Sequence, residues 1–346
     1  MHRSDGEPYP LTEAQAGLWY AQRLDPDNPA FNTAHALWIE GDLDVAAFAR
    51  AADRAAAEAE ALALRMDDSE AVPRQWVDDA CRPAIERVDL STRDDPDAVA
   101  REIMRGDRLT PIDPTRERLA RQCLLMLGPK RFVWYLRVHH FATDGYGMAL
   151  FGERVAELYA STEGGAPLAP LAQVLDEDAA YRQSERRGRD AAYWRETMAE
   201  APPPTGLEAG PETAADDCRR LIRPIDTTLR EGLLALAESL GQPWPDVLTA
   251  LTAEYCRRHA DAAETVIGVP CMGRLGSASA RVPASSSAAV VTVAIAASSC
   301  AATSAGSVPG GACTGRWSTC SRFTGRCAWR GCEPAWRSSA PARSTT

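Results

Sequence analysis

The fold is decided by RFVWYLRVHHFATDG, residues Arg131–Gly145, where a hydrophobic run leads directly into two adjacent histidines and an Asp-Gly pair. Valine and aromatic residues fill Arg131–Val138 and predict a buried strand. A second apolar run occupies Leu119–Leu127, and the Gly-Pro-Lys sequence at 128–130 is typical of a turn. The two runs are therefore predicted to form an antiparallel hairpin whose second strand ends at the histidines.

The residues that follow the strand can support proton chemistry. A histidine side chain titrates near neutral pH, so His139 or His140 can accept or deliver a proton. Loops at the end of a rigid sheet are common places for catalytic residues. Asp144 is close enough to shape the same loop or to cap a following helix, and Gly145 lets the backbone turn tightly. The residues alone fit a structural histidine pair as well as a catalytic one.

The rest of the chain alternates helices and short strands, with a boundary near residue 165. Apolar spacing predicts a helix after Gly145, and Ser161–Leu171 is a natural linker. Further helices are predicted at residues 11–24, 44–65, 97–108, 176–199, 228–240 and 245–260. Further strands are predicted at residues 35–40, 73–77, 219–225 and 265–269. This pattern indicates an α+β fold.

Composition and charge exclude several classes of function. The chain has 45% hydrophobic and 25% charged residues, as ordinary globular proteins do. Its formal net charge of −10 has the wrong sign for a general nucleic-acid binder. No apolar run approaches the length of a membrane helix, and the N-terminus has no signal-peptide core, so a soluble cytoplasmic protein without membrane partners is expected. The cysteines near the C-terminus lack CxxC spacing, and no metal site is expected.

The amino-acid composition of the chain changes at Ser285. Residues 285–346 contain no Leu, no Lys and no Asp, and Glu333 is their single acid. A segment of this size without leucine would have difficulty building a core. Almost all basic residues are Arg, which indicates GC-rich coding DNA, and such DNA read out of frame yields mainly Ala, Arg, Gly, Ser, Cys and Trp. We therefore expect a frameshift near Pro283 and little regular structure after residue 285; a genuine low-complexity extension is the alternative.

Several motifs resemble those of one family. The HHxxxDG pattern at His139–Gly145 looks like the active-site motif of condensation domains of non-ribosomal peptide synthetases. Leu11–Asn32 is similar to the opening motif of that family, with its AQxGLW core. Tyr181–Glu200 resembles a helical motif that contains the pair YW, and Ile267–Arg274 resembles the strand before the fifth motif.

The chain also departs from the family pattern. Ala52–Met66 stands in the place of the second motif, but it lacks the histidine of that motif and keeps only Glu60, Leu62 and Arg65. RVPASSSAAVV, residues 281–291, stands where a VGxxxNxxP-like fifth motif belongs. The resemblance therefore covers about residues 8–283 and ends where the composition changes.

The resemblance implies a two-lobed fold related to chloramphenicol acetyltransferase, with the active site in a tunnel between the lobes. It divides the chain into an N-terminal lobe at residues 1–165, a partial C-terminal lobe at residues 166–283, and an out-of-frame or disordered tail at residues 284–346. The N-terminal lobe would be complete, and the C-terminal lobe would be incomplete.

The resemblance also implies roles for the motif residues. His140 would be the catalytic histidine that positions or deprotonates the acceptor amine, and His139 would support the loop. Asp144 would be structural and paired with an arginine of the other lobe, for which Arg274 is the candidate. A helix cap for Asp144 and a solvated position for Arg274 are the alternatives. Gly145 would keep the floor of the tunnel clear.

The implied reaction is amide formation between an acyl or aminoacyl donor and an aminoacyl acceptor, each tethered by phosphopantetheine to a peptidyl or acyl carrier protein. No cofactor bound by this chain itself is expected. The donor carrier is expected to arrive in trans, because the first motif lies close to Met1. Loss of the fifth motif is expected to impair activity. The alternatives are a related HHxxxDG acyltransferase or epimerisation domain, and a non-catalytic fragment that at most docks a carrier protein.

Overall fold

The structure is a computed structural model that describes residues 8–161, 164–202, 207, 215, 217–218, 220–271, 282–284 and 289–296. These residues all belong to one compact unit, Met1–Ala302. Arg274 lies outside the described residues, as does the segment after residue 284 apart from residues 289–296. Within the described ranges, no helix is long and apolar enough to cross a membrane.

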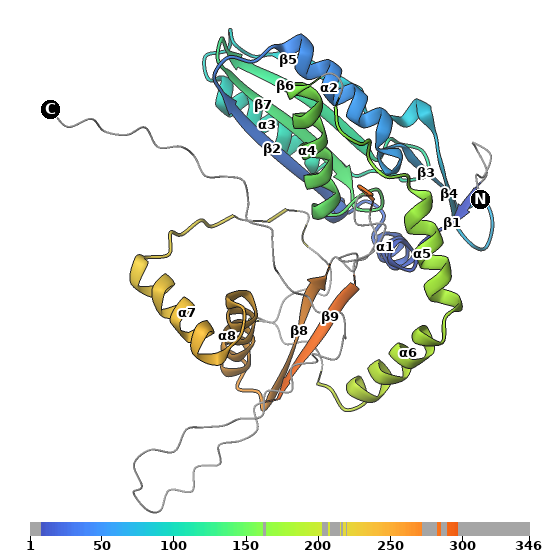
Figure 1. The fold of residues 1–346 in the computed structure, drawn as a ribbon, viewed down its shortest axis with the longest axis vertical. Helices are drawn as coiled ribbons and strands as arrows, with labels where there is room; N and C mark the ends of the chain where they lie inside the picture. Colours follow the sequence, from blue (N-terminus) through green and yellow to red (C-terminus); the bar gives the residue numbers. More distant parts are fainter. Residues whose placement is uncertain are drawn as a thin grey trace, which may run out of the picture. The chain divides into compact units, whose positions relative to one another are not determined.

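The N-terminal half is built on a four-stranded sheet in the order β2-β7-β6-β5 (Figure 1). Its strands are β2 (Asn32–Glu40), β5 (Ile85–Asp89), β6 (Ala120–Gly128) and β7 (Arg131–His139). β6 and β7 form the antiparallel hairpin that the sequence predicts; β2 pairs antiparallel with β7, and β5 pairs parallel with β6. Strand β5 was not predicted, because its IERVD sequence has only two apolar side chains.

Strand β7 is buried on both faces of the sheet. Its even-numbered residues 132–138 belong to the larger hydrophobic core, which α2 (Val45–Glu58) and α4 (Gly145–Ala160) cover. Tyr135 faces a smaller core on the side of α3 (Pro96–Arg108). Burial on both faces explains why the strand reads as a continuous apolar run rather than as an alternation of polar and apolar residues.

A smaller sheet lies next to the first helix and has the order β1-β4-β3. Its strands and the neighbouring short elements are β1 (Tyr9–Pro10), β3 (Leu64–Asp67), β4 (Arg74–Val77), helix α1 (Glu13–Leu24) and the 3-10 helices η1 (Pro29–Phe31), η2 (Glu60–Ala63) and η3 (Asp79–Cys81). The helix predicted over residues 44–65 is too long, since α2 ends at Glu58. Alanine favours a helix there, but Leu64 and Met66 are buried through pairing of β3 with β4, and this burial outweighs the local preference.

The C-terminal half contains helices α5 (Ala172–Gln183), α6 (Glu185–Met198), α7 (Thr227–Leu240) and α8 (Trp244–His259), and an antiparallel pair of strands, β8 (Glu264–Cys271) and β9 (Ala289–Ala296). The single helix predicted over residues 176–199 is wrong, because Ser184 leaves helical geometry and its side chain caps α6.

The strand predicted at residues 219–225 does not form, and residues 220–226 have no regular structure. Little regular structure is expected after residue 285, and the described part of that segment is strand β9, which pairs with β8 along its full length. The other residues after 285 lie outside the described residues, so this expectation stays a prediction. The β9 sequence AVVTVAIA is rich in valine and isoleucine, which favour strands whether or not leucine is present.

Candidate active site at the end of strand β7

His139 is the last residue of β7 and is fully buried. Its Nδ1 atom accepts a hydrogen bond from the backbone N–H of Phe141 at 3.2 Å, so the ring proton lies on Nε2. Nε2 is 3.2 Å from Oε1 of Gln22, to which it donates. The imidazole also stacks on the ring of Phe141, with ring centroids 4.8 Å apart. Both ring nitrogens are therefore occupied.

Burial also fixes the charge of His139. Removal from water lowers the pKa of this histidine to about 3, and the neighbouring His140 and Arg137 act in the same direction. A histidine with this pKa is neutral at physiological pH. His139 therefore has no free ring nitrogen, and its low pKa makes it a poor proton acceptor near neutral pH, which fits the loop-supporting role expected for it.

His140 has the opposite environment. Its side chain is half-buried, while its backbone N–H donates to the carbonyl oxygen of Phe31 at 2.8 Å. Within the part of the chain that the structure describes, its buried Nδ1 atom has no hydrogen-bond partner. The backbone of His140 is thus held in place, while the Nδ1 atom of its ring makes no hydrogen bond to any described residue.

Asp144 begins helix α4. Its side chain is buried, and Oδ1 accepts a hydrogen bond from the backbone N–H of Gly147 at 2.8 Å, which is an N-cap. The cap that the sequence offered as an alternative is therefore present. Its expected partner, Arg274, lies outside the described residues.

Gly145 and Gly147 differ in how much space the surrounding atoms leave for a Cβ atom. A Cβ atom at Gly145 would meet nothing within 4 Å among the described residues, so no close approach there requires glycine. A Cβ atom at Gly147 would lie 2.1 Å from Oγ1 of Thr143 and 3.0 Å from the backbone carbonyl carbon of Pro283. Gly147 is therefore the glycine that close packing requires, and the sequence analysis singled out only Gly145.

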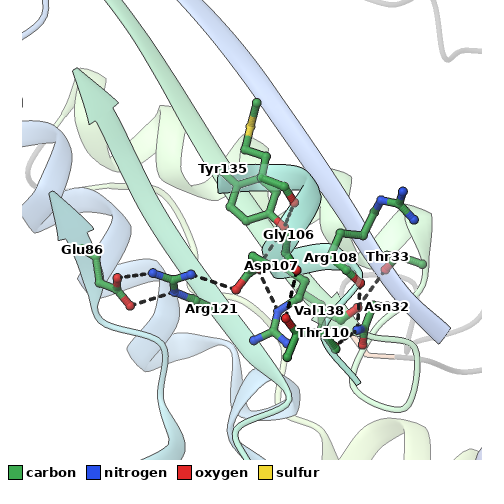
Figure 2. A network of polar contacts seen from close by, with 12 residues as sticks. Asn32, Thr33, Glu86, Gly106, Asp107, Arg108, Thr110, Arg121, Tyr135 and Val138 are labelled. Atoms are coloured by element: carbon green, nitrogen blue, oxygen red, sulfur yellow. Dashed lines mark hydrogen bonds and ion pairs between the residues drawn. The ribbon is translucent and has the colours of Figure 1, made fainter. Parts of the chain in front are cut away.

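A polar network supports β7 from the side of α3 (Figure 2). The carboxylate of Asp107 accepts hydrogen bonds from Tyr135 at 2.9 Å and Arg121 at 2.8 Å, and it lies 3.2 Å from Nε of Arg137. Arg121 also binds both carboxylate oxygens of Glu86 on β5. Burial, followed by the charge of Asp107, raises the pKa of Tyr135, which therefore stays a protonated donor. The network ties the last turn of α3 to β7 just before the histidine pair.

Strand β2, which pairs with the edge of β7 opposite β6, also contacts the end of β7 and the loop after α3. Nδ2 of Asn32 donates to the carbonyl oxygens of Arg108 at 3.0 Å and Thr110 at 2.7 Å (Figure 2). The hydroxyl of Thr33 donates to the carbonyl oxygen of Val138 at 3.1 Å. The end of β7 is therefore fixed by side chains on both neighbouring elements.

The residues that remain of the second motif have structural contacts. Oε2 of Glu60 accepts a hydrogen bond from the backbone N–H of Leu171 at 2.8 Å, and Leu62 is buried in the larger core. Arg65 pairs with Asp78 at 3.1 Å. These three side chains hold the linker and loops around β3 rather than the histidine pair.

A cavity of about 320 Å³ lies between the C-terminal part of α1 and the loop at residues 111–117. Trp19 and Gln22 line it, together with charged side chains such as Arg23 and Asp113. Neither histidine of the motif lines this cavity, so it is separate from the half-buried ring of His140.

Comparison with known proteins agrees with this geometry. The Condensation domain family matches residues 6–284. The chain is 39% identical over 287 residues to an isonitrile lipopeptide synthase of Streptomyces coeruleorubidus, covering 79% of the chain and 19% of that protein. It is 35% identical over 284 residues to a dimodular nonribosomal peptide synthase of Bacillus subtilis, covering 80% of the chain and 12% of that protein. The chain thus spans a fifth or less of the length of these two relatives.

Solved structures show the same fold. The first condensation domain of the calcium-dependent antibiotic synthetase, in complex with a substrate analogue, matches with a TM-score of 0.70 and 31% identity over 85% of this chain and 70% of that chain. The starter condensation domain of rhizomide synthetase matches with a TM-score of 0.65 and 30% identity over 84% of this chain and 67% of that chain. These matches confirm the predicted α+β fold and the family resemblance. The chain therefore belongs to the condensation domain family, which also occurs in nonribosomal peptide synthetases.

Proposed function

We propose that this domain joins a carrier-bound acyl or aminoacyl thioester to the amine of a carrier-bound aminoacyl acceptor, with His140 as the catalytic residue. The environment of His140 is the observation that supports this role. It is the histidine of the pair whose ring keeps an unpartnered nitrogen among the described residues, and its backbone is anchored at Phe31. His139 is neutral and hydrogen-bonded at both nitrogens.

Overall, the reaction moves one proton from the nitrogen of the acceptor amine to the sulfur of the leaving phosphopantetheine thiol. The acceptor amine attacks the thioester carbonyl, a C–N bond forms, the C–S bond breaks, and phosphopantetheine leaves as a thiol. His140 accepts a hydrogen bond from the amine, or takes its proton, as the C–N bond forms. The departing thiolate takes up a proton in exchange. Phosphopantetheine belongs to the two carrier proteins, which are the partners in this proposal.

The turnover assay uses soluble substitutes for the carriers. C8-CoA and Leu-SNAC are suitable probes, because a rhizomide synthetase starter condensation domain 29% identical to this chain was crystallised in a mutant form with both compounds. We expect the chain to form the C8-leucine amide, detected by mass spectrometry, and His140→Ala to reduce this product to background. His259→Ala is the matched control, since His259 lies on α8. Equal turnover in His140→Ala and the parent chain contradicts the assignment of His140.

Asp144 can be tested in the same assay. We propose that its carboxylate pairs with Arg274 in addition to capping α4. Asparagine is also a good N-cap, so Asp144→Asn keeps the hydrogen bond to Gly147 and removes only the charge. A loss of turnover in Asp144→Asn without a change in the unfolding midpoint supports the ion pair. Unchanged turnover leaves the cap as the whole role of Asp144.

A second candidate function is carrier docking without turnover. The family match ends at residue 284 although the chain continues to residue 346, and residues 281–291 lack the VGxxxNxxP-like fifth motif, which supports impaired catalysis. In that case the chain binds an immobilised acyl carrier protein, and His140→Ala binds it equally well, while neither forms an amide. Amide formation by the parent chain excludes this candidate.

We also propose that the change in composition at residue 285 reflects a shifted reading frame. The family match ends at residue 284, and residues 285–346 contain no leucine, no lysine and no aspartate. Resequencing the coding DNA around codon 284 and translating every forward frame tests this. A continuation with a VGxxxNxxP-like strand in another frame supports the proposal. The absence of such a continuation in all frames overturns it.

A further inference from the structure

Two glutamines of helix α1 contact the histidine turn from the same helix face. Gln15 and Gln22 are seven residues apart, which places them two turns apart on one side of the helix. Both side chains are buried, with 2% and 5% of their surfaces exposed. A buried amide is retained only where its donors and acceptors find partners, so the partners of each glutamine show what it holds.

Gln22 acts on His139. Its Oε1 atom accepts the Nε2–H of His139 at 3.2 Å. Its Nε2 group donates to the carbonyl oxygens of Asp25 at 2.9 Å, Pro26 at 3.1 Å and Asn28 at 3.1 Å. Three carbonyl acceptors fix which end of the amide is NH₂, and this leaves the oxygen facing the imidazole. Gln22 therefore favours the Nε2–H tautomer of His139, together with the backbone N–H of Phe141, which donates to Nδ1.

Gln15 acts on the other side of the turn. Its Nε2 group donates to the carbonyl oxygen of Phe141 at 3.1 Å and to Oε1 of Gln75 at 2.8 Å. Gln75 is fully buried on β4 and returns a hydrogen bond to Oε1 of Gln15 at 2.7 Å. The two amides thus hold each other in one orientation, with a donor aimed at the carbonyl that follows His140.

We propose that Gln15 and Gln22 are positioning residues that hold the turn His139–Phe141 from both sides, so that the ring of His140 is presented with a free nitrogen. This inference rests on the catalytic role proposed for His140. Among the described residues, neither glutamine is hydrogen-bonded to that ring; each acts through a neighbour, Gln22 through the side chain of His139 and Gln15 through the backbone of Phe141. A shift of about 1 Å in a reacting group can reduce the rate about 100-fold, so a loose turn is costly.

The test measures the histidine tautomer directly and does not depend on turnover. The chain is labelled with ¹⁵N-histidine, and imidazole NMR spectra are recorded at pH 7 for the parent, Gln22→Met and Gln122→Met. Gln122 is the matched control, because it is also fully buried and binds the carbonyl oxygen of Pro83 at 2.7 Å, but it has no contact with the turn. Comparison with His140→Ala assigns the signals of the pair. We expect a single Nε2–H tautomer for His139 in the parent and in Gln122→Met, and a mixture of tautomers in Gln22→Met.

A second variant covers the case in which Gln22→Met does not fold. Gln22→Glu keeps the volume and an oxygen acceptor that faces Nε2 of His139, while its second oxygen replaces the NH₂ group that binds the carbonyl oxygens of Asp25, Pro26 and Asn28. His139 should then keep its Nε2–H tautomer, because an acceptor still faces that nitrogen. An unchanged tautomer in Gln22→Met, or a loss of the Nε2–H tautomer in Gln22→Glu, overturns the proposal.

Turnover separates this inference from the proposed function. With the C8-CoA and Leu-SNAC assay, Gln15→Met and Gln22→Met should lower kcat about 10- to 100-fold with little change in KM, whereas Gln122→Met should keep both values. If the parent chain forms no amide, the proposed function fails for this chain, and the NMR comparison still decides whether Gln22 sets the tautomer. Equal kcat in Gln22→Met and Gln122→Met contradicts the positioning role.

Discussion

Residues 8–161 and residues 220–271 are both rich in leucine and alanine, yet they bury these side chains to very different extents. In the first region, α2 and α4 cover the four-stranded sheet, and side chains such as Phe48, Ala52 and Phe151 are almost fully buried. In the second region, the buried side chains of α7 and α8 are Ala237, Val247 and Ala253. Much of the apolar surface of these two helices is exposed, at Leu229, Leu234, Leu236, Leu240, Trp244, Leu248, Leu251 and Tyr255.

The difference shows that an amphipathic helix is buried only where another element offers a matching apolar face. The sheet β2-β7-β6-β5 presents such a face to α2 and α4. In the second region, β8 pairs only with β9 (Ala289–Ala296) among the described strands, and a two-stranded sheet offers less surface to α7 and α8. The leucine pattern alone therefore predicts that a helix forms but not that its face becomes buried.

The largest expected effect compares a leucine from each region. Leu124 on β6 is completely buried, while Leu251 on α8 is 48% exposed. Leu124→Ala should lower the free energy of unfolding by about 3 kcal/mol, because it leaves a cavity in the core. Leu251→Ala should lower it by at most about 0.5 kcal/mol. Urea unfolding of the two variants checks this, and equal losses would show that the second region is as well packed as the first.

The second prediction concerns the ion pair between Arg154 on α4 and Glu58 on α2, which lies next to the linker at Leu168. Arg154 on α4 is 3% exposed and binds Glu58 through two hydrogen bonds, of 2.6 and 2.9 Å. Burial raises the pKa of Glu58, but the hydrogen bonds from Arg154 and from the N–H of Leu168 and the nearby charge outweigh it, so the pKa is lowered. Arg154→Met should lower the free energy of unfolding by about 2 kcal/mol, because the half-buried carboxylate of Glu58 loses its two hydrogen bonds from Arg154.

The control for Arg154 is an exposed pair. Arg189 lies 3.6 Å from Glu185, and both side chains are mostly exposed. Arg189→Met should leave the urea midpoint unchanged, since exposed ion pairs contribute little to stability. A loss in Arg189→Met as large as that in Arg154→Met would contradict the distinction between buried and exposed pairs in this chain.

The third prediction tests how closely residues 282–284 approach α4. Gly147→Ala places a Cβ atom against Thr143 and Pro283, and it should lower the free energy of unfolding by about 2 kcal/mol through overpacking. Gly145→Ala is the matched control in the same helix, where the added atom meets no described residue. Thermal unfolding of both variants is the measurement. If Gly145→Ala costs as much as Gly147→Ala, the close contact with Pro283 is not what selects glycine.

The smallest expected effect is a pH dependence confined to the first region. The pKa of His139 is about 3 in the folded chain and 6.5 in the unfolded chain, so only the unfolded chain binds this proton between these values. The stability contribution is complete above pH 6.5 and is lost as the pH falls, by up to about 1.4 kcal/mol per pH unit. Unfolding at pH 6.5 and 5.5 should show a steeper decrease for the parent than for His139→Gln. Equal slopes would show that His139 is not buried as a neutral ring.

Much of the first region could be predicted from sequence, because its signals are local. The strand from Arg131 into His139, its antiparallel partner and the helix after Gly145 are each encoded in a short, continuous pattern. Predictions failed where a short segment is stabilised by distant partners. Leu64–Asp67 became a strand rather than the end of a helix, because it pairs with β4. Ile85–Asp89 became a strand because β6 offers a parallel edge.

The sequence by itself determined the family, the place of the histidine pair at the end of a buried strand, and the residue at which the family pattern ends. Only the tertiary structure decided which histidine is hydrogen-bonded at both ring nitrogens, and which glycine is needed. The reason is that residues far from the motif in sequence supply part of these contacts: Gln22 binds His139, and Pro283, together with Thr143 of the motif, lies against Gly147. Adjacent residues with the same side chain differ in their chemistry only through what folding places against them.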